Sequence, residues 1–372
     1  MNIERQKPCV ALVTHSLDWG GSPLSLWNLA RKLTDWKRIV ISEKEGPLRE
    51  QFESAGCVVH VVPRTGFMQL GLTRRLAGLF RQERVSLVHL NTLTSYYKYA
   101  AIAARLKKIP VVWFIREDVR EKRCRKLFWW IKTLADRIVP VSQEISANLY
   151  PAGAPAKVCV IYNGIEMPPV ATASAALRDA LKLSPTTPLI GCVAALEPRK
   201  GVEDLIKAFA EVVKQFSNAH LVCLGKDRSR DQHYRRQLES LISQLGLASQ
   251  IHLLGEVANP IGAYREFDLF VLPTHWEGCA RTLLEAMLQK CPVITTVAGG
   301  NPEVIQHQNT GWLVPPGDPA ALASAIQTLL KDRSAARNLA EAAHADWLKR
   351  FTLDRHVENV LAVYQAALKA DR

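Results

Sequence analysis

The sequence predicts an α/β fold built from two doubly wound domains, each with a parallel sheet. Short runs of β-branched and aliphatic residues alternate with longer amphipathic stretches along almost the whole chain. Continuous apolar strands separated by helices are typical of parallel sheets that helices cover on both faces. Two such series occur, and a segment rich in Pro, Ala, Ser and Thr lies between them. We therefore expect two domains of comparable size joined by a linker.

The predicted elements follow in chain order. The first series predicts strands at 9–14, 38–42, 58–62, 87–90, 111–115, 138–141 and 158–161. The second predicts strands at 189–194, 219–224, 251–254, 269–272, 293–295 and 311–314. Helical periodicity is clearest at 23–33, 202–215, 233–245, 281–289, 320–331, 335–350 and 353–370. The expected organisation is domain 1–166, linker 167–188 with one short helix at 175–183, domain 189–350, and a C-terminal helix, 351–372, that packs back on the first domain.

Composition excludes several classes of protein. The chain has 372 residues with 20 Gly and 20 Pro, so collagen and low-complexity disorder do not apply. It contains no run of 18 apolar residues and begins with a polar segment that lacks a secretory signal pattern. The 8 Cys are scattered without a Cys-x-x-Cys pair, which favours a reducing compartment and gives no support for a zinc site. We expect a cytoplasmic protein.

Positive charge is concentrated in the first half of the chain. Residues 1–165 hold 26 Lys+Arg against 13 Asp+Glu, whereas residues 166–372 hold 22 of each. The densest basic stretch, 105–126, is followed directly by Phe128, Trp129 and Trp130. Basic residues beside tryptophan suit an anionic membrane surface, which predicts a peripheral protein at the inner face of the membrane. A solvated helix face with buried tryptophans is the alternative, and binding of nucleic acid is the weakest of the three.

The strongest candidates for catalytic or binding residues follow the ends of strands in the second domain. Glu277 comes after the strand at 269–272, and Glu285 lies on the helix that follows. Gly299 and Gly300 come after the next strand and allow close approach of the backbone to a ligand. Ligands of doubly wound sheets bind outside the carboxyl ends of the strands, and with two domains the cleft between them is the expected place.

These motifs together resemble the signature of glycosyltransferase family 4, whose members are retaining enzymes of the GT-B architecture, with two Rossmann-like domains that face a central cleft. The usual pattern is E-G-F-G-x-x-x-x-E-A, followed by G-x-P-V-I-x-T and G-G-x-P-E. The chain matches it at 277–278, 285–286, 292–294 and 299–303, with Cys279 and Ala280 in place of Phe-Gly. Segments 161–166 and 311–318 are also similar to family motifs, so the resemblance extends over nearly the whole chain.

The resemblance implies a role for each matching residue of the second domain. Glu277 would contact hydroxyls of the donor sugar, and Glu285 would hold the ribose of the nucleotide. Lys200 matches a lysine that grips the diphosphate, while Ala195 stands where the family has an arginine and makes neighbouring Arg199 the candidate substitute. The resemblance also implies contacts between the nucleotide-sugar donor and the backbone of Gly255, Val257, Gly278, Cys279 and Ala280.

In the first domain, Gly20 and Gly21 resemble the family's glycine loop near the donor phosphates. Asp18 and Trp19 beside them are candidate acceptor contacts. Arg116 stands where many relatives have a histidine that faces the sugar, so it is expected to bind a sugar hydroxyl or a phosphate, or else to belong to the basic stretch. The candidate catalytic residues are therefore Glu277, Lys200 and Arg116.

The resemblance implies a retaining glycosyltransferase that moves a sugar from a nucleotide-diphosphate donor to a hydroxyl of a glycan or lipid-linked acceptor, in the synthesis of cell-surface polysaccharide or lipopolysaccharide. No Asp-x-Asp occurs in the chain, so no metal and no cofactor is expected. Two alternatives stay open. One is a GT-B nucleotide-sugar epimerase, and the other is a non-catalytic relative that binds nucleotide sugars.

Overall fold

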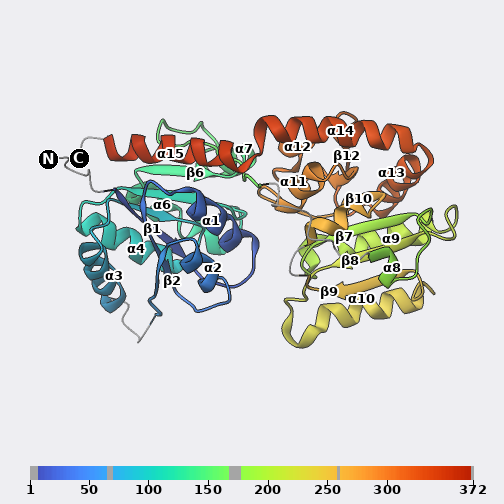
Figure 1. The fold of residues 1–372 in the computed structure, drawn as a ribbon, viewed down its shortest axis with the longest axis horizontal. Helices are drawn as coiled ribbons and strands as arrows, with labels where there is room; N and C mark the ends of the chain where they lie inside the picture. Colours follow the sequence, from blue (N-terminus) through green and yellow to red (C-terminus); the bar gives the residue numbers. More distant parts are fainter. Residues whose placement is uncertain (1–6, 65–69, 167–176, 258–259, 370–372) are drawn as a thin grey trace. The chain divides into compact units, whose positions relative to one another are not determined.

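The computed structural model describes residues 7–64, 70–166, 177–257 and 260–369, which form two compact units (Figure 1). Unit 1 comprises Met1–Ile165 and Thr352–Arg372, and unit 2 comprises Glu166–Phe351. Each unit contains one six-stranded sheet, and every strand pair within these sheets is parallel. The predicted α/β class with two doubly wound sheets is confirmed.

Unit 1 has the strand order β3-β2-β1-β4-β5-β6. Its strands are β1 (Cys9–Thr14), β2 (Lys37–Ser42), β3 (Val58–Val61), β4 (Leu87–Leu90), β5 (Val111–Ile115) and β6 (Arg137–Pro140). Its helices are α1 (Gly21–Lys32), α2 (Arg49–Ser54), α3 (Leu70–Gln82), α4 (Ser95–Leu106), α5 (Lys122–Arg125), α6 (Phe128–Leu134), α7 (Gln143–Leu149) and α15 (Leu353–Lys369). Helix α4 packs against α3 and α6, whereas α1 packs against α2 and α15.

The strand predicted at 158–161 is wrong. Val158 pairs with Ile138 of β6 in an isolated parallel bridge. The N–H of Ile138 donates to the carbonyl of Lys157 at 2.9 Å, and the N–H groups of Cys159 and Ile161 donate to the carbonyls of Ile138 and Pro140 at 3.0 Å and 3.1 Å. The chain then runs on to Ile165, which pairs with Thr352 at the start of the C-terminal segment. The stretch 158–161 therefore follows the edge of β6 without forming a regular strand, and Ile165 beyond it joins the C-terminal segment to unit 1.

Helix α15 belongs to unit 1 and is held there by polar contacts, two of them made by buried side chains. The fully buried hydroxyl of Tyr364 is hydrogen-bonded to Nδ1 of His89 on β4 at 2.6 Å. Nδ1 of His356 donates to the carbonyl of Tyr162 at 2.7 Å. At the helix start, Lys32 of α1 forms an ion pair with Asp354 at 2.9 Å. The last helix of the chain is thus part of the core of the first unit.

Unit 2 has the strand order β12-β11-β10-β7-β8-β9. Its strands are β7 (Leu189–Val193), β8 (His220–Leu224), β9 (Ile251–Gly255), β10 (Leu269–Leu272), β11 (Val293–Thr296) and β12 (Trp312–Val314). Its helices are α8 (Leu177–Ala180), α9 (Val202–Val212), α10 (His233–Gln244), α11 (Arg281–Leu288), α12 (Asn301–Val304), α13 (Pro319–Lys331) and α14 (Arg333–Arg350), with short 3-10 helices η1 (Pro198–Lys200), η2 (Arg230–Gln232) and η3 (Pro260–Arg265).

The order in which successive strands are added to the sheet reverses between β7 and β10. Strands β7, β8 and β9 add outward on one side, and β10, β11 and β12 add outward on the other. The loops that leave β7 and β10 lie at the carboxyl edge of the sheet at this reversal point, which is where such folds bind ligands. These two loops contain 194–201 and 273–280, the segments with the candidate site residues.

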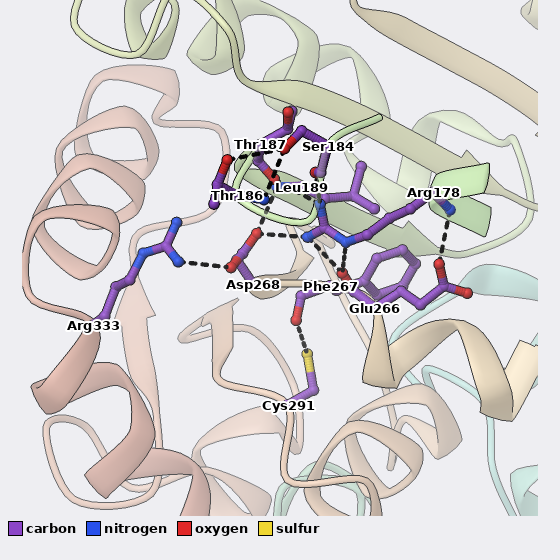
Figure 2. Close-up of polar contacts among 10 residues, drawn as sticks. All are labelled: Arg178, Ser184, Thr186, Thr187, Leu189, Glu266, Phe267, Asp268, Cys291 and Arg333. Carbon is purple, nitrogen blue, oxygen red and sulfur yellow. Dashed lines mark hydrogen bonds and ion pairs between the residues drawn. The ribbon is translucent and has the colours of Figure 1, made fainter. Parts of the chain in front are cut away.

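A polar network holds β7 beside β10 at the opposite, amino-terminal edge (Figure 2). Arg178 of α8 donates to the carboxylate of Asp268 at 2.9 Å and to the carbonyl of Glu266 at 3.0 Å. Asp268, just before β10, also accepts from the backbone N–H of Leu189 at 2.8 Å, and Arg333 of α14 lies 3.7 Å from its other oxygen. Residues 177–188 of the predicted linker, 167–188, are therefore bound to unit 2. Its first part, 167–176, lies outside the described residues.

The buried imidazoles of His89, on β4, and His356, on α15, predict a stability that depends on pH. Burial, with Arg116 nearby, lowers the pKa of His356 from 6.5 to about 4, and burial lowers the pKa of His89 well below its usual value. Folded unit 1 keeps both rings neutral, whereas the unfolded chain takes up protons below about pH 6.5. The free energy of unfolding should therefore fall as the pH drops from 6.5 towards 4, by up to about 1.4 kcal/mol per pH unit for each ring.

Denaturant unfolding of His356→Gln at pH 7, 6 and 5 checks this prediction. Glutamine keeps an N–H for the carbonyl of Tyr162 but does not titrate, so the loss of stability on acidification should be smaller than in the wild type. The matched control is His233→Gln, since His233 is exposed at the start of α10. Equal slopes for His356→Gln and wild type would show that His356 does not couple folding to protons.

Candidate functional site

Three loops at the carboxyl edge of the unit 2 sheet are bound to one another through their backbones. The carbonyl of Arg199, in the loop after β7, accepts from the N–H of His275 at 2.8 Å and from the hydroxyl of Thr274 at 3.0 Å, both after β10. The N–H of Gly300, after β11, donates to the carbonyl of Glu277 at 2.8 Å. The ends of β7, β10 and β11 therefore form one continuous surface.

Two glycines are required for this approach of the loops. Gly201 has φ +68°, and a Cβ at this position would lie 2.0 Å from the carbonyl oxygen of Pro273. Gly299 has φ +58°, and its Cβ would lie 2.0 Å from the carbonyl oxygen of Glu277. Any side chain would both occupy the left-handed region and push the neighbouring loop away. The glycine that the sequence motif places at 299 therefore sets the position of the Glu277 backbone.

Glu277 is paired with cations from the loop after β7. Nζ of Lys200 donates to its Oε1, and Nη1 of Arg199 lies 3.8 Å from the same oxygen. Arg199 also donates to the carbonyl of Trp276 at 2.8 Å and to Glu197 at 2.7 Å. The two neighbouring cations converge on one carboxylate, with Lys200 in direct contact and Arg199 largely engaged in holding the loop.

Glu285 has a different environment from Glu277. It lies in the middle of α11 and its side chain is only 8% exposed. Its Oε2 accepts from the hydroxyl of Tyr264 at 3.0 Å, and its Oε1 accepts from Nη2 of Arg281, one turn earlier on the helix, at 3.2 Å. Buried carboxylates require such donors. The two glutamates of the motif are thus separately bound, one by lysine and one by a phenol and a guanidinium.

The start of α11 presents backbone donors beside these carboxylates. Gly278, Cys279 and Ala280 are buried, and Ala280 is the N-cap residue without a side-chain hydrogen bond to the helix. The first N–H groups of a helix have no partner within it and attract anions. The small residues at 278–280 therefore leave an uncapped helix start close to the pair of Glu277 and Lys200.

The loop after β9 lies at the same edge of the sheet. Gly255 has φ +77°, and its carbonyl accepts from the N–H of Gly225 at 2.7 Å, which joins the loops after β8 and β9. Val257, two residues on, is 43% exposed. The structure thus places Gly255 at the end of β9 and Val257 in the loop that follows, and their role in reading a base stays a prediction.

The candidate residues of unit 1 gather between β1 and α1. Asp18 is exposed and Trp19 is 43% exposed, while Gly20 forms the N-cap of α1 without a side-chain hydrogen bond. Gly21 has open space where a Cβ would project. This is the turn that follows β1, next to the reversal point of the first sheet between β1 and β4. Their assignment to acceptor or phosphate stays a prediction.

Arg116 lies at the end of β5 and is bound within unit 1. Its Nε donates to the carbonyl of Asn91 at 3.0 Å, and its Nη1 contacts Oδ1 of Asn163. The guanidinium thus joins the loop after β4 to the 161–166 segment, which leads to α15. Its charge adds to burial, the larger cause, in lowering the pKa of His356. These contacts give Arg116 a structural function that its sequence position did not indicate.

Sequence reasoning missed several residues of the site. Arg281 could have been found, because it lies four residues before Glu285 on a predicted helix and such pairs face each other. Tyr264 gave no such signal, since only the packing of η3 against α11 brings it to Glu285. Thr274 and Asn163 likewise act through contacts between loops. Among the described residues no group of three or more His, Cys, Asp or Glu could hold a metal ion.

Comparison with known proteins gives two family matches. The family described as glycosyl transferases group 1 matches residues 174–346, and the family described as Glycosyltransferase Family 4 matches residues 19–167. The two matches fall on the second and first series of strands and cover most of the chain between them. They include Glu277, Glu285 and Lys200 in the first match and Arg116 in the second.

Similar proteins include two enzymes named for lipopolysaccharide core synthesis. The mannosyltransferase LpsB of Rhizobium meliloti (strain 1021) is 26% identical over 56% of this chain and 61% of its own length. The mannosyltransferase LpcC of Rhizobium leguminosarum bv. viciae is 29% identical over 57% of this chain and 61% of its own length. The chain therefore spans less than two thirds of each of these relatives.

Solved structures share the fold over almost the whole chain. HepE of Anabaena, in complex with UDP and glucose, has a TM-score of 0.87 at 24% identity and covers 96% of this chain and 100% of its own. WaaG, described as a glycosyltransferase involved in lipopolysaccharide biosynthesis, has a TM-score of 0.74 at 16% identity and covers 95% and 99%. The two six-stranded parallel sheets thus match the GT-B architecture, and the chain belongs to the group 1, family 4 type of glycosyltransferases.

Proposed function

We propose that this protein is a retaining glycosyltransferase that moves a sugar from a nucleoside-diphosphate donor to a hydroxyl group of a glycan or lipid-linked acceptor, in cell-surface polysaccharide or lipopolysaccharide synthesis. The observation that carries the proposal is the arrangement of Glu277, Lys200 and Glu285 at the β7–β10 reversal point of unit 2. The names of LpsB and LpcC, both in lipopolysaccharide core biosynthesis, support the proposed pathway.

Each group has a task in that reaction. Lys200 and the uncapped start of α11 supply positive charge for a diphosphate, which gains negative charge as the sugar departs. Glu277, already beside Lys200, would accept hydrogen bonds from hydroxyls of the sugar being transferred. Glu285, buried on α11, would accept from the ribose hydroxyls. Asp18 and Trp19 of unit 1 are the candidate contacts for the acceptor.

Glu277→Gln provides the test of this function. Purified wild type, incubated with UDP-, GDP- and ADP-sugars without acceptor, should release free sugar and nucleoside diphosphate slowly, as measured by HPLC. The amide keeps the shape of Glu277 but loses its charge, a change in hydrogen bonding worth about 1.5–3 kcal/mol, so release should fall roughly 10- to 150-fold. Affinity for the free diphosphate, measured by calorimetry, should change much less.

The same assay separates the alternatives. An epimerase would yield the isomeric nucleotide sugar, and a non-catalytic relative would bind a nucleotide sugar and leave it intact. Equal losses of diphosphate affinity and turnover in Glu277→Gln would contradict the assignment of Glu277 to the sugar. Failure of every nucleotide sugar to bind would contradict the proposed function as a whole.

We also infer that the reaction needs no metal ion, because Lys200 and the start of α11 can provide the positive charge that a divalent cation would otherwise supply to the diphosphate. EDTA should therefore leave sugar release unchanged to within about twofold, and Mg²⁺ or Mn²⁺ should not increase it. Complete inhibition by EDTA that either metal restores would show that this inference is wrong.

We propose further that unit 1 binds an anionic membrane surface through the segment 120–132, which combines basic and aromatic residues. Lys122, Arg125 and Lys126 are exposed, and so is Trp129, at 63%. The rings of Trp129 and Trp130 pack edge to face, with their centroids 4.8 Å apart. The exposure of Trp129 favours membrane binding over the alternative, a solvated helix face with both tryptophans buried. No helix among the described residues has the length and hydropathy needed to cross a bilayer.

The charge-removal variant Lys122→Gln/Arg125→Gln/Lys126→Gln tests membrane binding. Because each basic residue near an anionic surface contributes about 1 kcal/mol, co-sedimentation with phosphatidylserine-containing liposomes should weaken on the order of 100-fold. Binding by the wild type should also weaken as salt rises, since the Debye length is about 8 Å at physiological ionic strength. Neutral liposomes should retain little of either protein.

The matched control removes three exposed basic residues of unit 2, with Lys331, Arg337 and Lys349 each changed to Gln. It has the same net charge as the test variant and should bind anionic liposomes like the wild type. Equal loss in both variants would indicate attraction to total charge only, and no loss in either would favour a solvated helix face and a soluble acceptor.

A further inference from the structure

Unit 2 contains a phenol that is fully buried and points at a carboxylate of the candidate site. Tyr264, on η3, is 0% exposed, and its hydroxyl donates to Oε2 of Glu285 at 3.0 Å. The ring makes edge contacts with Phe267 and Phe270, at centroid distances of 6.0 Å and 5.1 Å. The aromatic packing fixes the ring, and the ring fixes the direction of the hydroxyl.

The hydroxyl of Tyr264 is a permanent donor. Burial and, next, the charge of Glu285 raise the pKa of Tyr264 well above its usual value, so the phenol is protonated at neutral pH. A buried phenol usually finds a partner for its O–H group. Here the partner is a carboxylate, which makes the bond charge-assisted and stronger than one between neutral groups.

A second donor from another element fixes the other oxygen of Glu285. Nη2 of Arg281, on α11 itself, donates to Oε1 at 3.2 Å. An ionised carboxylate has about four acceptor directions, two on each oxygen. One protein donor on each oxygen holds the plane of the carboxylate and leaves one direction per oxygen. Two adjacent hydroxyl groups of a ligand are the donors that match two such directions.

We propose that Tyr264 is a positioning residue for Glu285, whose hydroxyl holds the carboxylate in the orientation that accepts the two vicinal hydroxyls of the donor ribose. The proposal rests on the proposed function, which assigns the ribose to Glu285. Without this hydroxyl, Oε2 loses its protein donor, and the carboxylate must be ordered when the nucleotide binds. Tyr264 therefore acts on nucleotide affinity through Glu285 and has no direct contact with the ligand.

The experiment compares Tyr264→Phe with a matched control in the same unit. Phenylalanine keeps the ring packing and removes only the hydroxyl. The control is Tyr234→Phe, because Tyr234 is also buried, on α10, and burial raises the pKa of its hydroxyl to about 12. Calorimetry measures Kd for UDP, GDP and ADP, and then for the 2′-deoxy form of whichever nucleotide binds most tightly.

Tyr264→Phe should weaken binding of the ribonucleotide about tenfold, the effect of one hydrogen bond to a charged group. Binding of the 2′-deoxynucleotide should weaken less, so the preference for ribose should fall. A loss of folding stability alone would not change this preference. Tyr234→Phe should leave both affinities and their ratio at the wild-type values.

A double-mutant cycle with Glu285→Ala completes the test. In the Glu285→Ala background the further change Tyr264→Phe should have no effect on Kd, because its only route to the ligand is gone. Arg281→Met, which removes the other donor, should also reduce the preference for ribose. This second variant keeps the test informative if Tyr264→Phe folds poorly.

The outcomes that overturn the proposal are distinct. If Glu285→Ala weakens ribonucleotide binding but Tyr264→Phe leaves both Kd and the preference for ribose unchanged, Tyr264 has no positioning role and the proposed function stands. If Glu285→Ala itself leaves ribonucleotide binding unchanged, the ribose assignment fails and the positioning role fails with it. Equal effects of Tyr264→Phe with and without Glu285 would also overturn it.

Discussion

The candidate site of unit 2 depends on the adjacency of β7 and β10, two parallel strands from which the chain departs in opposite directions. Adjacency is enforced at the amino-terminal edge, where Asp268 binds Arg178 and the N–H of Leu189. At the carboxyl edge the same adjacency brings the loop after β7 against the loop after β10, and Gly201 lets the two backbones meet. A defect in the pairing of these strands would therefore separate Lys200 from Glu277 without any change at either residue.

Within that frame, the hydrogen-bond partners of each carboxylate decide what it can do. Glu277 contacts a flexible cation, and an ion pair of this kind can rearrange when a charged ligand arrives. Glu285 is more buried and is bound by Tyr264 and Arg281 from two elements, so its orientation is set before any ligand is present. Preorganisation of this kind lowers the entropy lost on binding. The two glutamates of one motif therefore differ in how their orientation is held, because their partners differ.

Unit 1 shows how a charged residue can serve the fold next to a candidate site. Arg116 is held by Asn91 and Asn163, and burial together with the charge of Arg116 keeps His356 of α15 neutral. The helix that ends the chain is thereby connected to the end of β5. The family resemblance predicts a sugar contact at position 116. The structure shows that this side chain connects the end of β5 to the 161–166 segment.

The sequence alone determined the features that depend on neighbours along the chain. Periodicity predicted both sheets and the helices, and the motif residues Glu277, Glu285 and Lys200 were identifiable because their spacing is local. The tertiary structure decided which distant groups meet. Tyr264 reaches Glu285 across 21 positions, and Lys32 reaches Asp354 across 322. Such contacts leave no periodic signal, because they depend on how elements pack and on which backbone groups are already paired. For the same reason the 158–161 stretch has the composition of a strand but is not one.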